Sequence, residues 1–74
     1  MGVLRRLDRR GDTETAWDEK DRASLTKALR LFEEHIKLGG MAYEIEKPRE
    51  PAEVIRHFNP LAKEIILAPR MVGG

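Results

Sequence analysis

Alternating positions near the start of the chain predict two short β-strands joined by a tight turn. In residues 3–9, Val3 and Leu7 share alternate positions with two arginines, while residues 13–17 place threonines and a tryptophan on one face and glutamate and alanine on the other. A period of two residues is typical of a strand. Between the two runs, Gly11 can take the positive φ of a bend, so we expect a β-hairpin that turns at this glycine.

Apolar residues in the middle of the chain recur at steps of three and four, and this spacing predicts an α-helix over about residues 21–38. The apolar stripe of this helix consists of Leu25, Ala28, Leu29, Phe32 and Ile36. Asp18 or Asp21 can cap the start of the helix by accepting hydrogen bonds from free backbone N–H groups. Gly39 can end it in the left-handed conformation that glycine adopts readily.

The second half of the chain predicts two further strands with an ambiguous segment between them. Residues 41–47 alternate apolar and polar positions, and residues 63–68 form the most apolar run, whose lack of alternation predicts a central strand covered on both faces. Residues 52–58 fit either a short helix or an edge strand, and we favour a helix or an irregular turn. Residues 59–62, "NPLA", have the asparagine and proline typical of a type I turn.

The order of strand, strand, helix, strand, irregular segment and strand indicates an α+β fold. A right-handed crossover through the helix lets the last strand pair beside the first, with the helix on one face of a mixed sheet, which is the β-grasp arrangement. We expect Leu29, Phe32 and Ile36 to be buried against Ile65 and Leu67, because the stripe and the most apolar strand have no other adequate partner. If the ambiguous segment is instead a strand of an antiparallel meander, the fold class is unchanged and the sheet order differs.

Length and composition place the chain in one small domain. Its 74 residues leave room for one helix and one small sheet, so we expect a folded domain over residues 1–69 and a flexible tail over residues 70–74. Cysteine is absent, which favours a reducing compartment and requires apolar packing to stabilise the fold. No apolar segment is long enough to span a membrane or to form a signal peptide. We therefore expect a cytoplasmic protein without membrane contact.

The charges are balanced, with 14 lysines and arginines against 13 acidic residues and a net charge of +1. A general polyanion binder normally carries a clear basic excess, so no specific nucleic acid is expected as a partner. The one local bias is an arginine cluster at Arg5, Arg6, Arg9 and Arg10. This cluster can contact a phosphate or an acidic partner, although arginines that line the solvated edge of a hairpin are the commoner case.

Residues suited to catalysis are sparse, and we expect neither a metal site, a cofactor nor an enzymatic activity. His35 and His57 are the only histidines, and Glu33, Glu34 and His35 are expected on the solvated face of the helix, opposite the apolar stripe. The single serine, Ser24, lies in the first helical turn, where a local hydrogen bond is its ordinary role. A binding or transferable module is the class that remains.

The order of the predicted elements is similar to that of ubiquitin-like β-grasp proteins, and the end of the chain resembles theirs. The last six residues read Pro-Arg-Met-Val-Gly-Gly, whereas a ubiquitin-type tail follows its last strand with leucine, arginine, leucine, arginine, glycine and glycine. In this match Arg70 stands for the first tail arginine and Met71 for a leucine. Gly73 and Gly74 are the conjugating glycines. Val72 departs from the second arginine, which leaves the identity of an activating enzyme open.

This resemblance implies a ubiquitin-like protein modifier, or a sulfur-carrier-type protein, that an ATP-dependent activating enzyme activates at Gly74. Arg70, Met71 and Val72 would contact that enzyme, and Gly73 would give a slender approach because glycine lacks a Cβ. The implied partners are the activating enzyme, an isopeptidase and target proteins. Without the resemblance, a Gly-Gly end is equally consistent with a frayed terminus.

The alternative is a small structural or assembly protein of a virion or another multi-subunit complex. Such a protein would be held by its arginine-rich hairpin and by β-addition along an exposed sheet edge. The two functions differ over the end of the chain, because the modifier requires Gly74 and the assembly protein does not.

Overall fold

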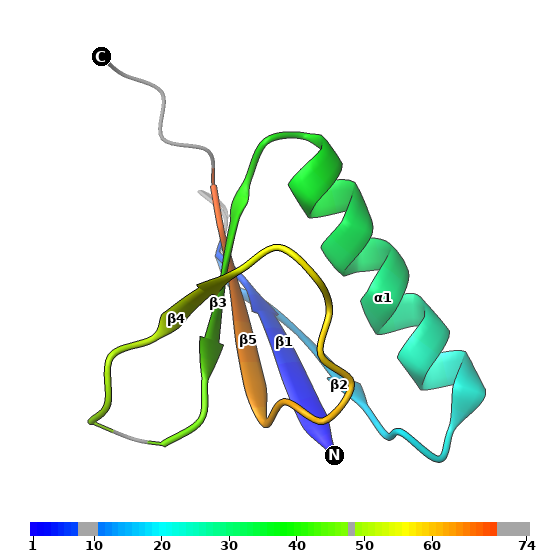
Figure 1. The fold of residues 1–74 in the computed structure, drawn as a ribbon. Helices are drawn as coiled ribbons and strands as arrows, with labels where there is room; N and C mark the ends of the chain where they lie inside the picture. Colours follow the sequence, from blue (N-terminus) through cyan, green and yellow to red (C-terminus); the bar gives the residue numbers. More distant parts are fainter. Residues whose placement is uncertain (8–10, 48, 70–74) are drawn as a thin grey trace.

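The computed structural model describes residues 1–7, 11–47 and 49–69, which form a single helix packed on a five-stranded sheet (Figure 1). The elements in chain order are β1 (Gly2–Arg6), β2 (Thr13–Trp17), α1 (Arg22–Lys37), β3 (Met41–Ile45), β4 (Glu53–Ile55) and β5 (Glu64–Ala68). Their order in the sheet is β2-β1-β5-β3-β4. This arrangement confirms the predicted α+β class with a β-grasp-like topology.

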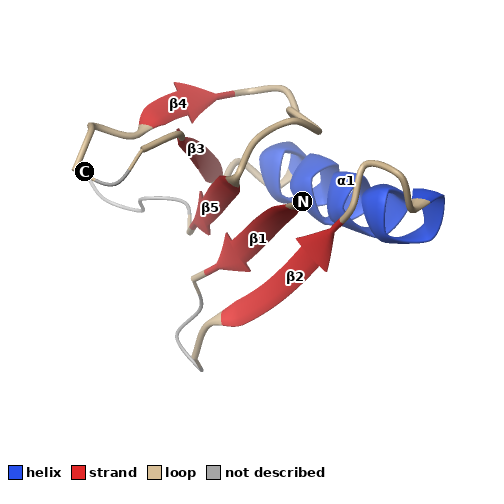
Figure 2. Cartoon of the chain, turned by 90° about the horizontal axis from the view of Figure 1, so that it is seen from below, coloured by secondary structure: helices blue, strands red, loops and turns tan. Residues whose placement is uncertain are grey.

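The central strand of the sheet is β5, as predicted from its apolar sequence. It pairs parallel to β1 on one side and antiparallel to β3 on the other, whereas the β1–β2 and β3–β4 pairs are antiparallel. A parallel neighbour requires a crossover connection, which α1 provides between the hairpin and β3. Figure 2 shows the helix on one side of the curved sheet, with β2 and β4 at its two edges.

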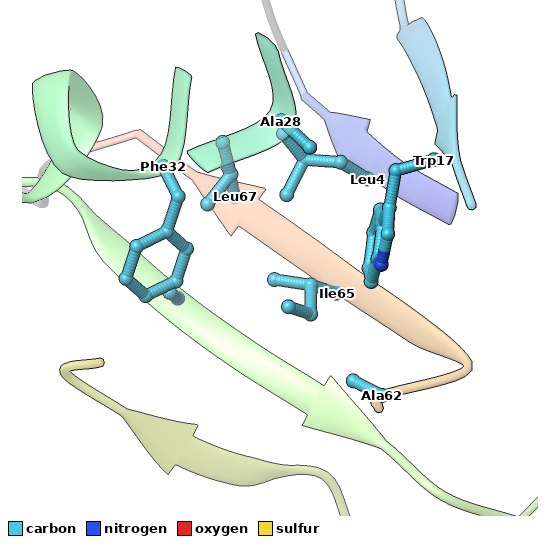
Figure 3. Packing of buried hydrophobic residues seen from close by; sticks show 8 residues of the cluster. Leu4, Trp17, Ala28, Phe32, Ala62, Ile65 and Leu67 are labelled. Atoms are coloured by element: carbon cyan, nitrogen blue, oxygen red, sulfur yellow. The ribbon is translucent and has the colours of Figure 1, made fainter. Parts of the chain in front are cut away.

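The core lies between α1 and the face of the sheet that it covers. Alternate residues of β1 and β5 point into the core. Leu4 of β1 is paired with Ile65 of β5, and both are almost fully buried, as is Leu67. Figure 3 shows these side chains meeting Ala28 and Phe32 of the helix. On the opposite face of the sheet, Ile66 keeps an intermediate exposure, so the described residues cover that face less fully. The prediction that both faces of β5 are covered is confirmed only for the face beneath α1.

The predicted helix stripe is correct for Phe32 but wrong for Leu29. Phe32 is 1% exposed and Ala28 is fully buried, whereas Leu29 is 36% exposed; Ile36 is partly buried against the core. A helix turns by about 100° per residue, and the sheet faces the direction of Ala28 and Phe32. Leu29 therefore lies at the margin of the buried face, while Leu31, on its other margin, packs partly against the core.

An aromatic cluster holds the segment after β4 over the end of the core. The Phe58 ring lies 5.0 Å from that of Trp17 and 5.7 Å from that of Phe32, measured between centroids, and the Trp17 indole N–H donates a hydrogen bond to the Pro60 carbonyl at 3.0 Å. A Cβ on Gly2 would come within 2.2 Å of the Trp17 ring. The indole can therefore lie across β1 only because that position has no side chain.

Within residues 52–58 the structure corrects our preference for a helix or an irregular turn. Glu53–Ile55 form β4, which pairs antiparallel with β3 from Ala42 to Glu44. Branched side chains at Val54 and Ile55 favour a strand, and β3 offers an unpaired edge. The strand ends after three residues, so the rest of the segment remains irregular, and β5 keeps its place between β1 and β3.

The predicted helix and turn signals act where expected. Asp21 is the N-cap residue, and its carboxylate accepts a hydrogen bond from the Ala23 N–H at 3.1 Å. Gly39 follows the C-cap residue with a φ of 88°, and Gly11, in the connection between β1 and β2, has the predicted positive φ, at 124°. Residues 8–10 lie outside the described part of the chain.

We predict that Phe32→Ala lowers the free energy of unfolding by about 3–5 kcal/mol, because it removes a fully buried ring and leaves a cavity. Leu29→Ala is the matched control, because it places alanine in the same helix at a position that is 36% exposed. Its cost should be about 1 kcal/mol or less. Urea unfolding of the two variants measures both values. Equal losses would contradict the orientation of the helix described above.

Candidate functional site

The candidate site is the point where the C-terminal segment leaves the sheet. The residues expected to be recognised and conjugated lie outside the described part of the chain: Arg70, Met71, Val72, Gly73 and Gly74. The residues just before them, Ala68 and Pro69, are described and mark where the segment begins.

Pairing on both sides fixes the last residues of β5. On one side the Leu7 N–H donates to the Leu67 carbonyl at 3.0 Å, and on the other Ala68 pairs with Met41 of β3. Pro69 follows directly and is exposed. Because proline has no N–H to donate to a ladder, the regular pairing ends at Ala68, one residue after Leu67, which has partners on both sides.

His35 fastens this position to the end of the helix. Its Nε2 lies 2.6 Å from the Ala68 carbonyl oxygen and 3.1 Å from that of Met41. Both oxygens are acceptors, so Nε2 carries the proton and donates to them. One side chain therefore connects the last turn of α1, the start of β3 and the end of β5.

The expectation that His35 lies on the solvated face of the helix is wrong. His35 comes seven residues after Ala28 and three after Phe32, and residues seven apart occupy nearly the same face of a helix. This spacing was present in the sequence. The sequence does not show that two backbone carbonyls accept from His35: one belongs to Met41, six residues later, and the other to Ala68, 33 residues later in the chain.

Gly40 allows the histidine to reach these carbonyls. A Cβ on Gly40 would lie 2.2 Å from the His35 Nε2 and within 2.6 Å of two carbons of the ring. The Gly40 N–H also donates to the His35 carbonyl at 3.0 Å. The Gly-Gly pair after the helix thus combines a left-handed residue, Gly39, with one that leaves space for a side chain.

Of the four arginines predicted to contact a partner, the structure describes Arg5 and Arg6. Arg5 and Arg6 are neighbours on β1 and point to opposite faces of the sheet, while Arg9 and Arg10 lie outside the described residues. Strand β1 is also an interior strand, paired with β2 and β5. The half-exposed Arg5 guanidinium forms ion pairs with Glu14 at 3.0 Å and Glu64 at 3.3 Å, so part of its charge is already matched.

A second polar feature is the cleft beside β3, with a volume of about 440 Å³. Glu44 is 9% exposed and accepts a hydrogen bond from the Asn59 side-chain N–H at 3.1 Å. The Asn59 side-chain oxygen accepts from the Leu61 N–H, and its backbone carbonyl accepts from the Ala62 N–H, both at 3.0 Å. The glutamate therefore fixes the predicted turn against β3, which explains why a carboxylate is buried there.

Across residues 1–7, 11–47 and 49–69, no three histidine, aspartate or glutamate side chains are placed to hold a metal ion. The described helix is neither long nor apolar enough to cross a membrane.

The chain was also compared with models of known families, with curated proteins and with solved structures, and none of them matches it.

We predict that His35→Ala lowers the free energy of unfolding by about 1–2 kcal/mol, because two carbonyls lose their donor. Gly40→Ala should have a similar cost, since its methyl group displaces the imidazole. In the His35→Ala background the methyl group meets no ring, so Gly40→Ala should then cost much less. Urea unfolding of the two single variants and the double variant measures this coupling. If Gly40→Ala costs the same in both backgrounds, the contact between the two residues is not the one described.

Proposed function

We propose that this chain is a ubiquitin-like protein modifier, or a sulfur-carrier-type protein, whose Gly74 carboxylate is activated by an ATP-dependent partner enzyme. The observation that carries the proposal is the position of β5: the central strand of a β-grasp-like sheet runs directly into the segment that contains Gly73 and Gly74. The proposal requires Gly74 to carry the free carboxylate, either as encoded or after proteolytic trimming.

The described residues supply a fixed starting point for such a segment. Strand β5 is paired on both sides, Pro69 ends the pairing, and His35 holds the Ala68 carbonyl at 2.6 Å. An enzyme that grips the folded domain would therefore meet the segment at a defined place. Binding then costs less conformational entropy than it would if the start of the segment were not held by the sheet.

In the proposed reaction the chain is the substrate and supplies no catalytic group. The Gly74 carboxylate attacks the α-phosphate of ATP and releases pyrophosphate, which gives an acyl adenylate. A cysteine thiolate of the enzyme then displaces AMP and forms a thioester. Attack on the thioester by an amine of a target gives an amide, and attack by hydrosulfide gives a thiocarboxylate; either step releases the enzyme thiolate. Arg70, Met71 and Val72 would be gripped during these steps, and the two glycines fit a narrow channel because they lack a Cβ.

The proposal predicts a diagnostic peptide in cells that make the protein. Trypsin cleaves after Arg70, so a conjugated chain leaves Met-Val-Gly-Gly on a lysine of the target. Mass spectrometry of a digest from the native cell should find this remnant on other proteins, or, for a sulfur carrier, an intact protein in which sulfur replaces one oxygen of the Gly74 carboxylate. A variant without Gly74 should lose both products and keep its melting temperature.

The same samples test recognition of the segment. Arg70→Glu reverses a charge in the part that the enzyme must grip, so it should reduce the amount of conjugate while leaving the fold intact. If no other protein carries the remnant, the native protein carries no sulfur at Gly74, and its intact mass shows an extension beyond Gly74 that is never removed, the modifier function is wrong.

A structural or assembly role remains the second candidate, and the two edge strands favour it. Among the described residues, strands β2 and β4 are each paired on one side only, and an unpaired edge can accept a strand of another chain. Under this function the protein would be recovered in a stable complex, and deletion of Gly74 would leave that complex intact.

A further inference from the structure

A groove runs between the end of α1 and the segment that contains β4. One hollow of about 230 Å³ lies between the last turns of α1 and residues 56–58, and another of about 270 Å³ lies between Ile36, the start of β3 and residues 54–56. Ile36 and Arg56 line both hollows, so the two form one continuous surface, called here the α1–β4 groove. Figure 1 shows the segment after β4 beginning opposite the C-terminal half of the helix.

The floor of the α1–β4 groove is apolar and packs against the core. Phe32 is 1% exposed, and Ile36, Ile55 and Phe58 are partly buried and pack against the core. The rings of Phe32 and Phe58 are also in edge-to-face contact with each other. An apolar side chain placed here would therefore meet surface that is already ordered, and binding would not require the floor to be assembled first.

The rim of the groove carries an excess of positive charge. Lys37 and Arg56 are exposed at its sides, and Glu33 is the single acidic residue that lines it. Among the described residues, the ion pairs involve only Arg5 and its partners, so neither Lys37 nor Arg56 is neutralised by one. A ligand with carboxylates beside an apolar side chain matches both the charge of this rim and the chemistry of this floor.

The backbone beside the groove is also open to a partner. Strand β4 is an edge strand, and Val54 is 56% exposed. The other end of the groove reaches Gly40 and Met41, and Met41 pairs with Ala68 at the point where the C-terminal segment leaves the sheet.

We propose that the α1–β4 groove docks a short segment of a partner protein in which apolar residues are flanked by aspartate or glutamate. The apolar side chains occupy the floor over Phe32 and Ile36, and the carboxylates pair with Lys37 and Arg56. A partner held there lies next to the base of the C-terminal segment. This inference does not depend on activation of Gly74.

A selection from displayed random dodecapeptides tests the proposal. The bait is the full chain, and the counter-bait is the Lys37→Glu/Arg56→Glu variant, after its melting temperature has shown that it is folded. Enriched peptides should combine large apolar residues with acidic ones, and they should bind the variant at least about tenfold more weakly. The variant, used as bait, should instead enrich apolar peptides with lysine or arginine.

A matched control separates the groove from general charge effects. Arg22→Glu/Lys27→Glu makes the same change of charge at exposed positions in the first half of α1, and it should leave peptide binding unchanged. In an NMR titration with a synthesised enriched peptide, shifts of backbone amides should be confined to residues 32–37, 40–42 and 54–58. The proposal is overturned by a lack of enrichment, by enrichment of basic peptides, by shifts elsewhere, or by equal weakening in the control variant.

Discussion

Burial of one face of β5 beneath α1 is the interaction on which the rest of the structure depends. Ile65 and Leu67 are fully buried there, and their strand is paired with β1 on one side and β3 on the other. The β1–β5 pair is parallel, so it exists only because α1 carries the chain across the sheet. In a chain without cysteine, this packing has to supply the stability that disulfides supply to many small domains.

The same packing determines where the C-terminal segment begins. Since β5 is central, its end is held on both sides: Leu67 pairs with the β1 side and Ala68 with Met41 of β3, and the His35 side chain adds an attachment from the helix. Gly40, Met41 and Ala68 meet at this corner of the molecule, which is also one end of the α1–β4 groove. The proposed function and the proposed docking surface thus share a rigid corner, although each can be wrong without the other.

The sequence predicted most of the fold because periodicity is a local property. The hairpin, the helix with a cap at Asp18 or Asp21 and the central place of β5 all follow from patterns along one segment. The errors concern contacts between segments. Leu29 was expected to be buried and is 36% exposed, whereas His35 was expected to face solvent and contacts two strands. The apolar stripe alone does not give the direction in which the sheet lies. Residues 53–55 form a strand, and not the predicted helix or turn, because they pair with the edge of β3.

The candidate site could be predicted only in part, for the same reason. The glycines and Arg70 are visible in the sequence, but the attachment of Ala68 to His35 depends on two carbonyls brought together by the fold. The α1–β4 groove is likewise formed by residues about 20 positions apart, which no local motif connects.

Hydrogen exchange measured by NMR tests the central claim, namely that β5 anchors the sheet and the base of the C-terminal segment. The account predicts that the amides of residues 65–67 exchange only by global unfolding and are among the slowest, while those of β4 exchange faster by local opening. Exchange of the β5 amides as fast as those of β4 would contradict it.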